Sequence, residues 1–258
     1  MLQIEIAVAK VPKYAVLESG DSVEVVERPR GGISIVIADG QRSGRSAKAI
    51  SNMAVRKAVG LLAEGVRDGA VARAAHDCLR TQRGGQVSAE LTIISVDLET
   101  RTLVISRNSR CPVLLSGAQT NEGSEGSATG EDAGNEGAWR ALSDSTEPVG
   151  VHVRARPTIV ELPLSAGQTV IAFTDGLLHA GSRRGRSLDP IQVVSEIGCP
   201  PHCLATEVAD ELLRSALALD ESRPADDVTV VVVQILDAAG AGGPEIRRMT
   251  VSFPVSHG

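Results

Sequence analysis

The sequence predicts an α+β fold in which largely antiparallel sheets are covered by helices. Segments typical of strands come first, two helical segments follow, and strands then return with one late helix before a final strand. A doubly wound parallel sheet would instead alternate strands and helices regularly along the chain. No internal repeat is evident in the 258 residues. We therefore expect a single domain spanning residues 1–258.

The strands are predicted from alternating or β-branched apolar residues. Near the N-terminus, residues 2–9 alternate strongly, 22–27 follow a Ser-Gly-Asp turn, and 31–38 form a β-branched run. Further strands are expected at 91–97, 103–107, 112–115, 158–162, 169–173 and 228–236. The segments 91–97 and 103–107 flank a short connection, which predicts a hairpin.

Helices are predicted where apolar residues recur at spacings of three and four. These segments are 46–64, 68–83 and 204–219. In the second of them Val71, Ala75 and Leu79 share one face. The pair Gly84-Gly85 follows it and is typical of a helix C-terminus.

The stretch 117–137 differs in composition from the rest of the chain. It contains Gly, Ser, Ala, Asn and five acidic residues, with no basic residue. Such a composition cannot bury enough apolar surface to order itself, so we interpret it as a mobile surface insertion. A linker between two domains is the competing interpretation. Strands resume at 158–162 without any sign of a new start, which disfavours the linker.

The C-terminal segment 246–255 alternates apolar and polar residues after a Gly-Ala-rich joint at 238–243. We expect it to add an edge strand to a sheet. The alternative is that it crosses to a partner subunit and forms an edge-strand dimer. The sequence does not determine the oligomeric state.

Composition excludes several classes of function. The net charge is −6 and aromatic residues make up only 2% of the chain, whereas nucleic-acid binding needs a basic face and, for single strands, stacking aromatics. No apolar run is long enough to span a membrane, and residues 1–10 alternate where a signal peptide would be continuously apolar. We expect a cytoplasmic protein that binds neither nucleic acid nor membrane.

Aspartates lie at the ends of three strongly apolar strands. Asp39 follows 34–38, Asp175 follows 170–174, and Asp226 precedes 228–233. Carboxylates on separate strand ends can converge on one point, where divalent cations with oxygen ligands would remove their repulsion. A single Asp-Gly most often marks only a turn. Spacing alone therefore leaves metal binding and turn formation equally open.

These segments resemble, in order along the chain, the motifs of the metal-dependent protein phosphatases (PPM family). The motifs are Ser19-Gly20-Asp21, Ala38-Asp39-Gly40, Phe173-Thr174-Asp175-Gly176 and Asp226-Asp227-Val228-Thr229. Lesser matches begin at Asn108 and at Pro148-Val149-Gly150. The bacterial sporulation stage II E (SpoIIE) branch is the most similar, and the resemblance runs from about residue 3 to residue 236.

The resemblance implies a four-layer α-β-β-α sandwich, with two largely antiparallel sheets face to face and helices outside. It implies two Mn²⁺ or Mg²⁺ ions. Asp39 would bridge both ions and the Gly40 carbonyl would bind one of them. Asp175 and Asp226 would complete the other ion's ligands. Asp21 is the candidate for the second ion, directly or through water.

The resemblance further implies that Asp39, Asp175 and Asp226 are catalytic. Asp227 would not bind a metal ion itself but would support the residues that do. The activity would be hydrolysis of phosphoserine or phosphothreonine by a metal-activated water. The substrate would be a phosphorylated regulatory protein, typically an anti-sigma-factor antagonist in a bacterial partner-switching system. The alternative is a catalytically weak or inactive module that binds such a partner without turnover.

One departure from the family pattern lies in the loop after Asp39. The family usually has Asp-Gly-x-Gly-x-Gly, and this chain has Arg42 at the second Gly. If that position requires a positive φ, the arginine costs on the order of 1 kcal/mol. Alternatively, Arg42 and Arg45 would help to bind the phosphate, because a guanidinium matches its geometry.

Overall fold

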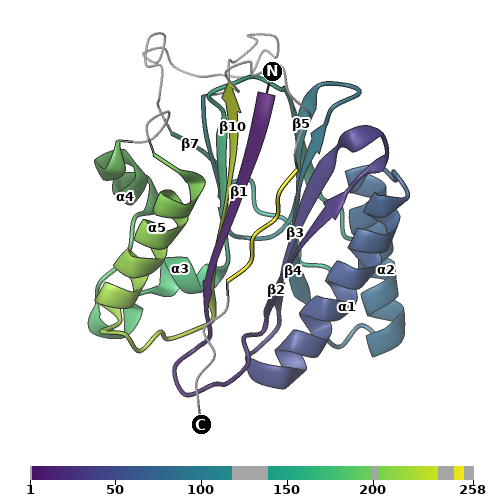
Figure 1. The fold of residues 1–258 in the computed structure, drawn as a ribbon. Coiled ribbons are helices and arrows are strands. Elements are labelled where there is room, and N and C mark those ends of the chain that lie inside the picture. The colour runs from purple at the N-terminus through teal and green to yellow at the C-terminus, as the bar shows by residue number, and fades with distance from the viewer. Residues whose placement is uncertain (1, 118–138, 199–202, 238–246, 253–258) are drawn as a thin grey trace, which may run out of the picture.

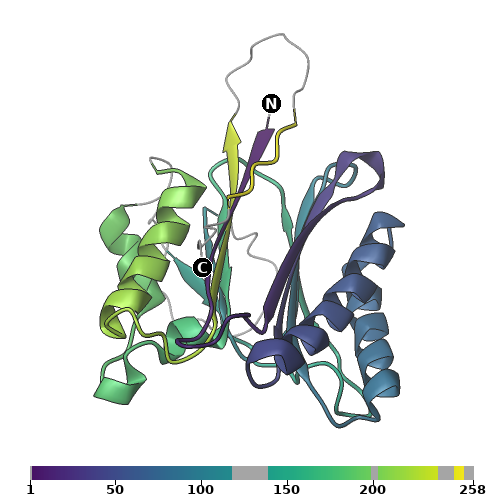
Figure 2. The same ribbon diagram turned by 60° about the horizontal axis from the view of Figure 1, so that its bottom comes forward.

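The computed structural model describes residues 2–117, 139–198, 203–237 and 247–252. Two five-stranded antiparallel sheets lie between two groups of helices (Figure 1). This is the predicted α+β class and the expected four-layer sandwich. The layers are seen edge-on in Figure 2, with helices on both outer faces.

The first sheet contains the two ends of the described domain. Its strand order is β1 (Leu2–Val11), β10 (Val228–Asp237), β9 (Thr169–Phe173), β6 (Val113–Ser116) and β7 (Arg140–Leu142). Its outer face is covered by α3 (Asp175–His179), α4 (Pro190–Ile197) and α5 (Ala205–Leu219). Antiparallel pairing of β1 with β10 therefore brings the first and last strands of the fold side by side.

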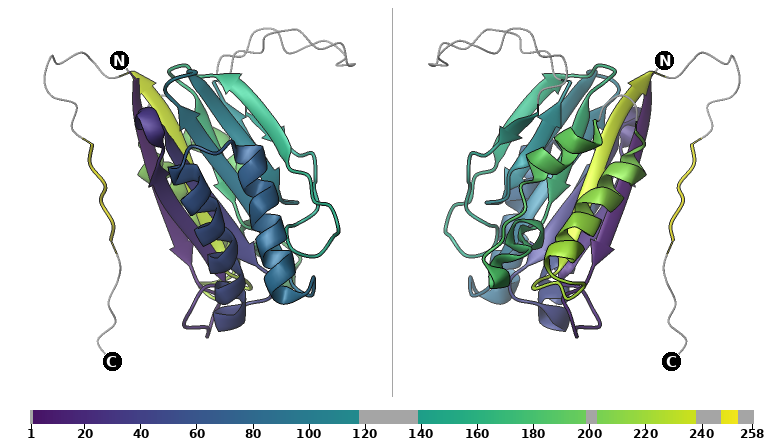
Figure 3. Two further views of the ribbon diagram at one scale, coloured as in Figure 1. Left: turned by 90° about the vertical axis from the view of Figure 1, so that its right-hand side faces the viewer. Right: turned by 90° about the vertical axis from the view of Figure 1, so that its left-hand side faces the viewer.

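The second sheet is a meander extended by one later strand. Its order is β2 (Asp21–Glu27), β3 (Ile33–Gly40), β4 (Ala89–Asp97), β5 (Thr102–Asn108) and β8 (Thr158–Pro163). Helices α1 (Gly44–Ala63) and α2 (Asp68–Arg83) cover it, as the left view of Figure 3 shows. The right view of Figure 3 shows α4 and α5 over the first sheet. Short 3₁₀ turns occur at Pro29–Gly31 and Ser182–Arg184.

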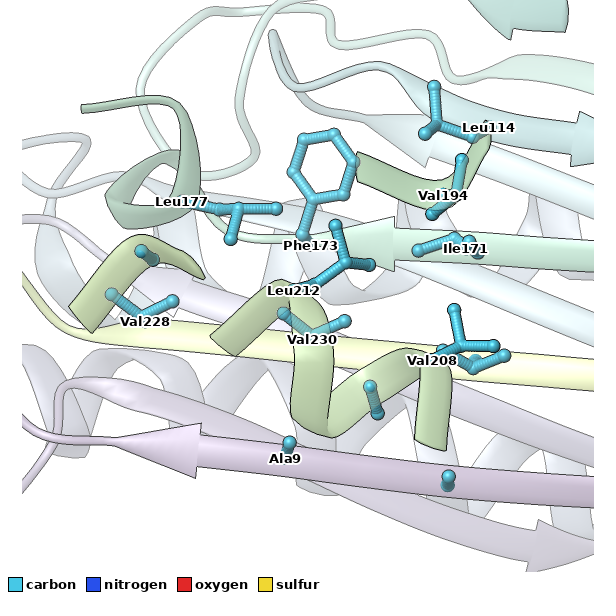
Figure 4. Close-up of a cluster of buried hydrophobic side chains, with 14 of the residues drawn as sticks. Ala9, Leu114, Ile171, Phe173, Leu177, Val194, Val208, Leu212, Val228 and Val230 are labelled. Atoms are coloured by element: carbon cyan, nitrogen blue, oxygen red, sulfur yellow. The ribbon is translucent and has the colours of Figure 1, made fainter. Parts of the chain in front are cut away.

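Three apolar clusters hold the layers together, and β10 contributes to two of them. Val228, Val230 and Val232 face the helices, whereas Val231 and Val233 face the other sheet. A strand that is buried on both faces needs a continuous apolar run, which explains the valine-rich sequence of β10. Figure 4 shows part of the first cluster, where Phe173, Leu177 and Leu212 meet between β9, α3 and α5.

Apart from the C-terminal segment 246–255, the predicted helices and strands are confirmed, with small shifts at their ends. Helix α1 begins at Gly44, two residues before the expected start, and α2 ends at Arg83 with Gly84 in the left-handed conformation. Helices α3 and α4 and strand β7 were not predicted. Helix α3 and strand β7 are too short to show a period. For α4 the sequence does offer a signal, because Asp189-Pro190 is a typical helix start, and Asp189 Oδ1 accepts the amide of Ile191 at 2.9 Å.

The edge strand predicted at 246–255 is not confirmed. Residues 247–252 are described and no strand is assigned to them, so the expected edge strand is not formed there. Met249 and Val251 are each 67% exposed, and Arg247 pairs with Glu27 at 3.1 Å. Alternation fits any extended chain, and without a buried face it does not produce sheet pairing. Residues 246 and 253–255 of this segment, and 118–137 of the expected insertion, lie outside the described residues.

Within the described residues, none of the helices has both the length and the apolar character needed to cross a membrane.

The junction between β3 and α1 yields a prediction about stability. A Cβ added at Gly40 would lie 2.1 Å from the carbonyl oxygen of Ala47, so Gly40→Ala should force the helix away from the strand. We expect a loss of about 1–3 kcal/mol in the free energy of unfolding, measured by urea denaturation.

Gly60→Ala is the matched control, because a Cβ at Gly60 meets no heavy atom within 4 Å. That position lies within α1, so alanine should stabilise the protein by about 0.5–1 kcal/mol. Equal stability of the two variants would contradict the packing account.

Candidate active site

The aspartates lie at the start of β2, the end of β3, the start of α3 and just before β10. In Figure 1 the lower edge of the sandwich contains α3 and the end of β3 that leads into α1. The β2–β3 register pairs Asp21 with Asp39, and the β3–β4 register pairs Asp39 with Glu90. From the other sheet, Asp175 begins α3 directly after β9, and Asp226 lies just before β10. Both sheets therefore contribute carboxylates to the same edge.

Asp21 is fully buried and connects the two sheets. Its Oδ2 accepts hydrogen bonds from Thr174 Oγ1 at 2.9 Å and Thr229 Oγ1 at 2.6 Å. Its Oδ1 is buried and has no hydrogen-bond partner. Burial raises the pKa of Asp21 to about 6, although both threonine hydrogen bonds act in the opposite direction. A buried carboxylate oxygen without a partner is costly, so this atom is suited to a ligand.

Asp39 has the most perturbed carboxyl group of the site. Its pKa is raised to about 10, first by burial and then by the charges of Asp21, Asp175 and Glu90. The pKa of Asp175 is also raised, by burial and then by Asp226. Carboxylates that raise one another's pKa are close enough to repel when ionised.

Asp226 and Asp227 have different environments although they are adjacent. Asp227 is 4% exposed, and its two oxygens accept the backbone amides of Lys13 and Gly20, each at 2.9 Å. It thereby fastens the loop between β1 and β2 to the start of β10. Asp226 Oδ1 accepts only the amide of Asp227, at 3.0 Å, among the hydrogen bonds of the described residues. Asp226 is therefore the freer of the two to bind a cation.

The glycine after Asp175 allows the two segments of the first sheet to approach closely. A Cβ at Gly176 would lie 2.1 Å from the carbonyl oxygen of Asp227. Any side chain at Gly176 would therefore separate Asp175 from the aspartates before β10.

Glu90 is a site residue that the sequence analysis missed. It is the cross-strand partner of Asp39, and its carboxylate accepts Ser109 Oγ at 2.6 Å and the amide of Arg110 at 3.2 Å. Its charge contributes to the raised pKa of both Asp39 and Asp175. Only the strand register places it here, and a single sequence does not reveal register.

Two lysines beneath the site were also missed. Lys10 Nζ and Lys48 Nζ each donate to the backbone carbonyl of Asp21 at 2.6 Å. Burial, followed by the charge of Lys48, lowers the pKa of Lys10 to about 8. These ammonium groups place positive charge next to the buried carboxylates.

The two arginines expected to bind phosphate have separate positions. Arg42 has φ +77°, so the loop requires the left-handed conformation that the family's glycine would adopt freely. For an arginine this costs on the order of 1 kcal/mol. Arg42 lines a cavity of about 430 Å³, whereas the side chain of Arg45 is 94% exposed and lies 4.0 Å from Glu18. The structure therefore does not bring Arg45 and Arg42 to a common position.

The residues present fit hard divalent cations. The donors are carboxylate oxygens, which Mg²⁺ and Mn²⁺ prefer, and Asp21 Oδ1 is a buried acceptor without a partner. In the described part of the chain, no group of three or more His, Cys, Asp or Glu side chains is already arranged to hold an ion. The carboxylates are thus near one another without being arranged around a common point in the described residues.

Two antiparallel sheets packed face to face, with helices outside and aspartates at one edge, define the metal-dependent phosphatase sandwich. The family model described as Stage II sporulation protein E (SpoIIE) matches residues 29–236. The chain belongs to this family: it is a SpoIIE-type PPM phosphatase domain. No curated protein sequence matches the chain.

Solved structures share this fold at low sequence identity. A structure of the PP2C phosphatase domain and a regulatory-domain fragment of SpoIIE from Bacillus subtilis is 19% identical, with a TM-score of 0.72 and coverage of 93% of this chain and 65% of that chain. RsbX in complex with magnesium is 16% identical, with a TM-score of 0.63 and coverage of 91% and 100%. The catalytic domain of the serine/threonine phosphatase PstP, in complex with two manganese ions, is 16% identical, with a TM-score of 0.65 and coverage of 92% and 100%.

The raised pKa values predict how the metal-free protein responds to pH. In the folded protein the pKa of Asp39 is about 10 and that of Asp21 is about 6, whereas an Asp in the unfolded chain has a pKa near 4. Both groups therefore bind a proton more tightly in the folded state. Stability should therefore fall as the pH rises from about 5 to 7.5. Thermal unfolding in EDTA measures this, and Mn²⁺ should raise Tm more at pH 7.5 than at pH 5.

Asp39→Asn tests the assignment of this effect. The amide cannot ionise, so the metal-free variant should be more stable than the wild type at pH 7.5 and should lose most of the pH dependence. A wild-type Tm that rises between pH 5 and 7.5 in EDTA would contradict the electrostatic account.

Proposed function

We propose that this protein is a metal-dependent phosphatase that hydrolyses phosphoserine or phosphothreonine on a bacterial regulatory protein. Membership of the SpoIIE family supports the class of reaction. The observation that carries the proposal for this chain is the position of Asp39, which strand pairing places between Asp21 and Glu90 and whose pKa is raised by burial and by its neighbouring carboxylates. Carboxylates held so close together repel one another when ionised, and bound cations would remove that repulsion.

We assign Asp39, the Gly40 carbonyl, Asp175 and Asp226 as the ligands of two Mn²⁺ or Mg²⁺ ions. Asp21 would contribute its Oδ1, directly or through water. When bound, two such ions would lower the pKa of a water, orient the phosphate and offset the charge that develops on it. Asp39, Asp175 and Asp226 are the catalytic residues in this assignment.

The other residues of the chain keep these ligands in place. Thr174 and Thr229 bind Oδ2 of the Asp21 carboxylate and leave Oδ1 without a hydrogen-bond partner, which supports its assignment to an ion. Asp227 holds the 12–20 loop against the start of β10. Removal of either support would misplace a ligand without removing it.

The proposed substrate is a phosphorylated regulatory protein, of the anti-sigma-factor antagonist kind, and the proposed location is the cytoplasm. Resemblance to the SpoIIE branch supports both. The second candidate function, a weak or inactive module that binds such a partner, is favoured by Arg42 at a left-handed position in the loop beside Asp39.

Asp175→Asn provides the test of the reaction. The amide removes one anionic ligand, so Mn²⁺-dependent release of phosphate from a phosphopeptide should fall by at least about 100-fold. Phosphate release is measured for the wild type with Mn²⁺ and again with excess chelator, which should abolish it.

Asp210→Asn is the matched control, because Asp210 is exposed within α5 and is not one of the strand-end aspartates. It should retain wild-type activity. Full activity of Asp175→Asn would refute the assignment. Binding of a phosphoprotein by the wild type, without release of phosphate from any substrate, would instead favour the second candidate.

A further inference from the structure

A polar cavity of about 430 Å³ lies beside the loop that follows Asp39. Its charged lining residues are Arg42 and Arg83, and its polar ones are Gln41, Ser46 and Gln86. No carboxylate belongs to this lining. The cavity is thus cationic, although the chain has a net charge of −6 and the neighbouring edge is acidic.

The two arginines come to the cavity from segments far apart in the sequence. Arg42 follows β3, and Arg83 is the last residue of α2. The walls are tied together, since the amide of Gln41 donates to Ser88 O at 3.0 Å and the amide of Ser88 donates to Gln41 Oε1 at 3.2 Å. One backbone and one side-chain hydrogen bond thus tie the loop after β3 to the segment after α2, and the charged and polar lining residues are exposed.

The positive charge of this cavity is not neutralised within the described residues. Among the described residues, neither Arg42 nor Arg83 forms an ion pair; the ion pairs involve other basic side chains. Helix α1 begins at the cavity with no acidic residue in its first turn and no side-chain cap, so its amide groups add to the positive potential. Arg42 also retains an unfavourable φ of +77°.

We propose that this cavity binds the carboxylate of an acidic residue that flanks the phosphorylated residue in the protein substrate. The placement rests on the proposed function, because it takes the Asp39 edge as the point of phosphate release. Arg42 follows Asp39 by three residues, so their Cα atoms are at most about 11 Å apart. An extended peptide covers that distance in about three residues.

The lining favours an acidic side chain as the occupant. Two guanidinium groups match a carboxylate in charge and in hydrogen-bonding geometry. Ala49, Ile50 and Val87 supply an apolar wall for the methylene groups of the side chain. The cavity is large enough for a glutamate side chain together with its remaining water.

Two phosphoserine-mimic peptides provide the test, each with a non-hydrolysable phosphonate in place of the phosphate. One carries Glu at every position within three residues of the mimic, and the other carries Gln. With Mn²⁺ present, fluorescence anisotropy should show that the wild type binds the Glu peptide about tenfold more tightly. In Arg83→Gln the two peptides should bind within about twofold of each other.

Arg56→Gln is the control for loss of an arginine, because Arg56 is exposed on α1 and does not line the cavity. It should keep the wild-type preference. Arg42→Gly is a second test that cannot fail through unfolding, since glycine relieves the positive φ. It should raise Tm by about 2–4 °C and still lose the preference for Glu.

Equal binding of the two peptides by the wild type, including binding too weak to detect for both, would overturn the proposal. So would a preference that survives in Arg83→Gln. Failure of the proposed function has a different signature: the Glu preference would persist while hydrolysable versions of both peptides release no phosphate with Mn²⁺.

Discussion

The structure depends on one buried carboxylate, that of Asp21, held between the two sheets. A buried charge without partners would be strongly unfavourable, and two threonine hydroxyls from the opposite sheet supply the partners for one of its oxygens. This contact joins the start of β2 to the ends of β9 and β10. The apolar cluster between the sheets supplies the adhesion, whereas Asp21 fixes how their edges are aligned. Strand register places Asp39 and Glu90 beside Asp21, and the alignment of the sheets sets where Asp175 and Asp226 lie relative to them.

The remaining carboxylates make the edge electrostatically unfavourable in the absence of cations. Strand pairing places Asp39 between Asp21 and Glu90, and the close approach at Gly176 brings Asp175 near the aspartates before β10. The fold tolerates this arrangement because the layers are held by extensive apolar contacts elsewhere. A rigid frame that keeps like charges together is also a frame that holds ligands ready for a divalent ion, with little reorganisation on binding.

The sequence was most informative where chemistry repeats along the chain. Apolar runs followed by Asp predicted the strand ends, and the order of the motifs predicted the family and the sandwich. Glu90, Lys10 and Arg83 were missed because each is brought to its place by register or by packing between elements far apart in sequence. Helix α3 was missed since a single turn has no period. The segment 246–255 shows the converse error, in which alternation was taken to predict a strand although all of residues 247–252 are exposed.

At Arg42 the sequence pattern and the structure bear on the same residue. The sequence marked it as a departure from a glycine pattern, and the structure shows that its backbone adopts the left-handed conformation which glycine would favour. A strained residue persists only where the surrounding structure compels it, and here two hydrogen bonds between Gln41 and Ser88 hold the residue before Arg42. Strain without function would be removed by a single change to glycine. An arginine that faces a cationic cavity, three residues from the central aspartate, has instead the position expected of a residue that selects the substrate.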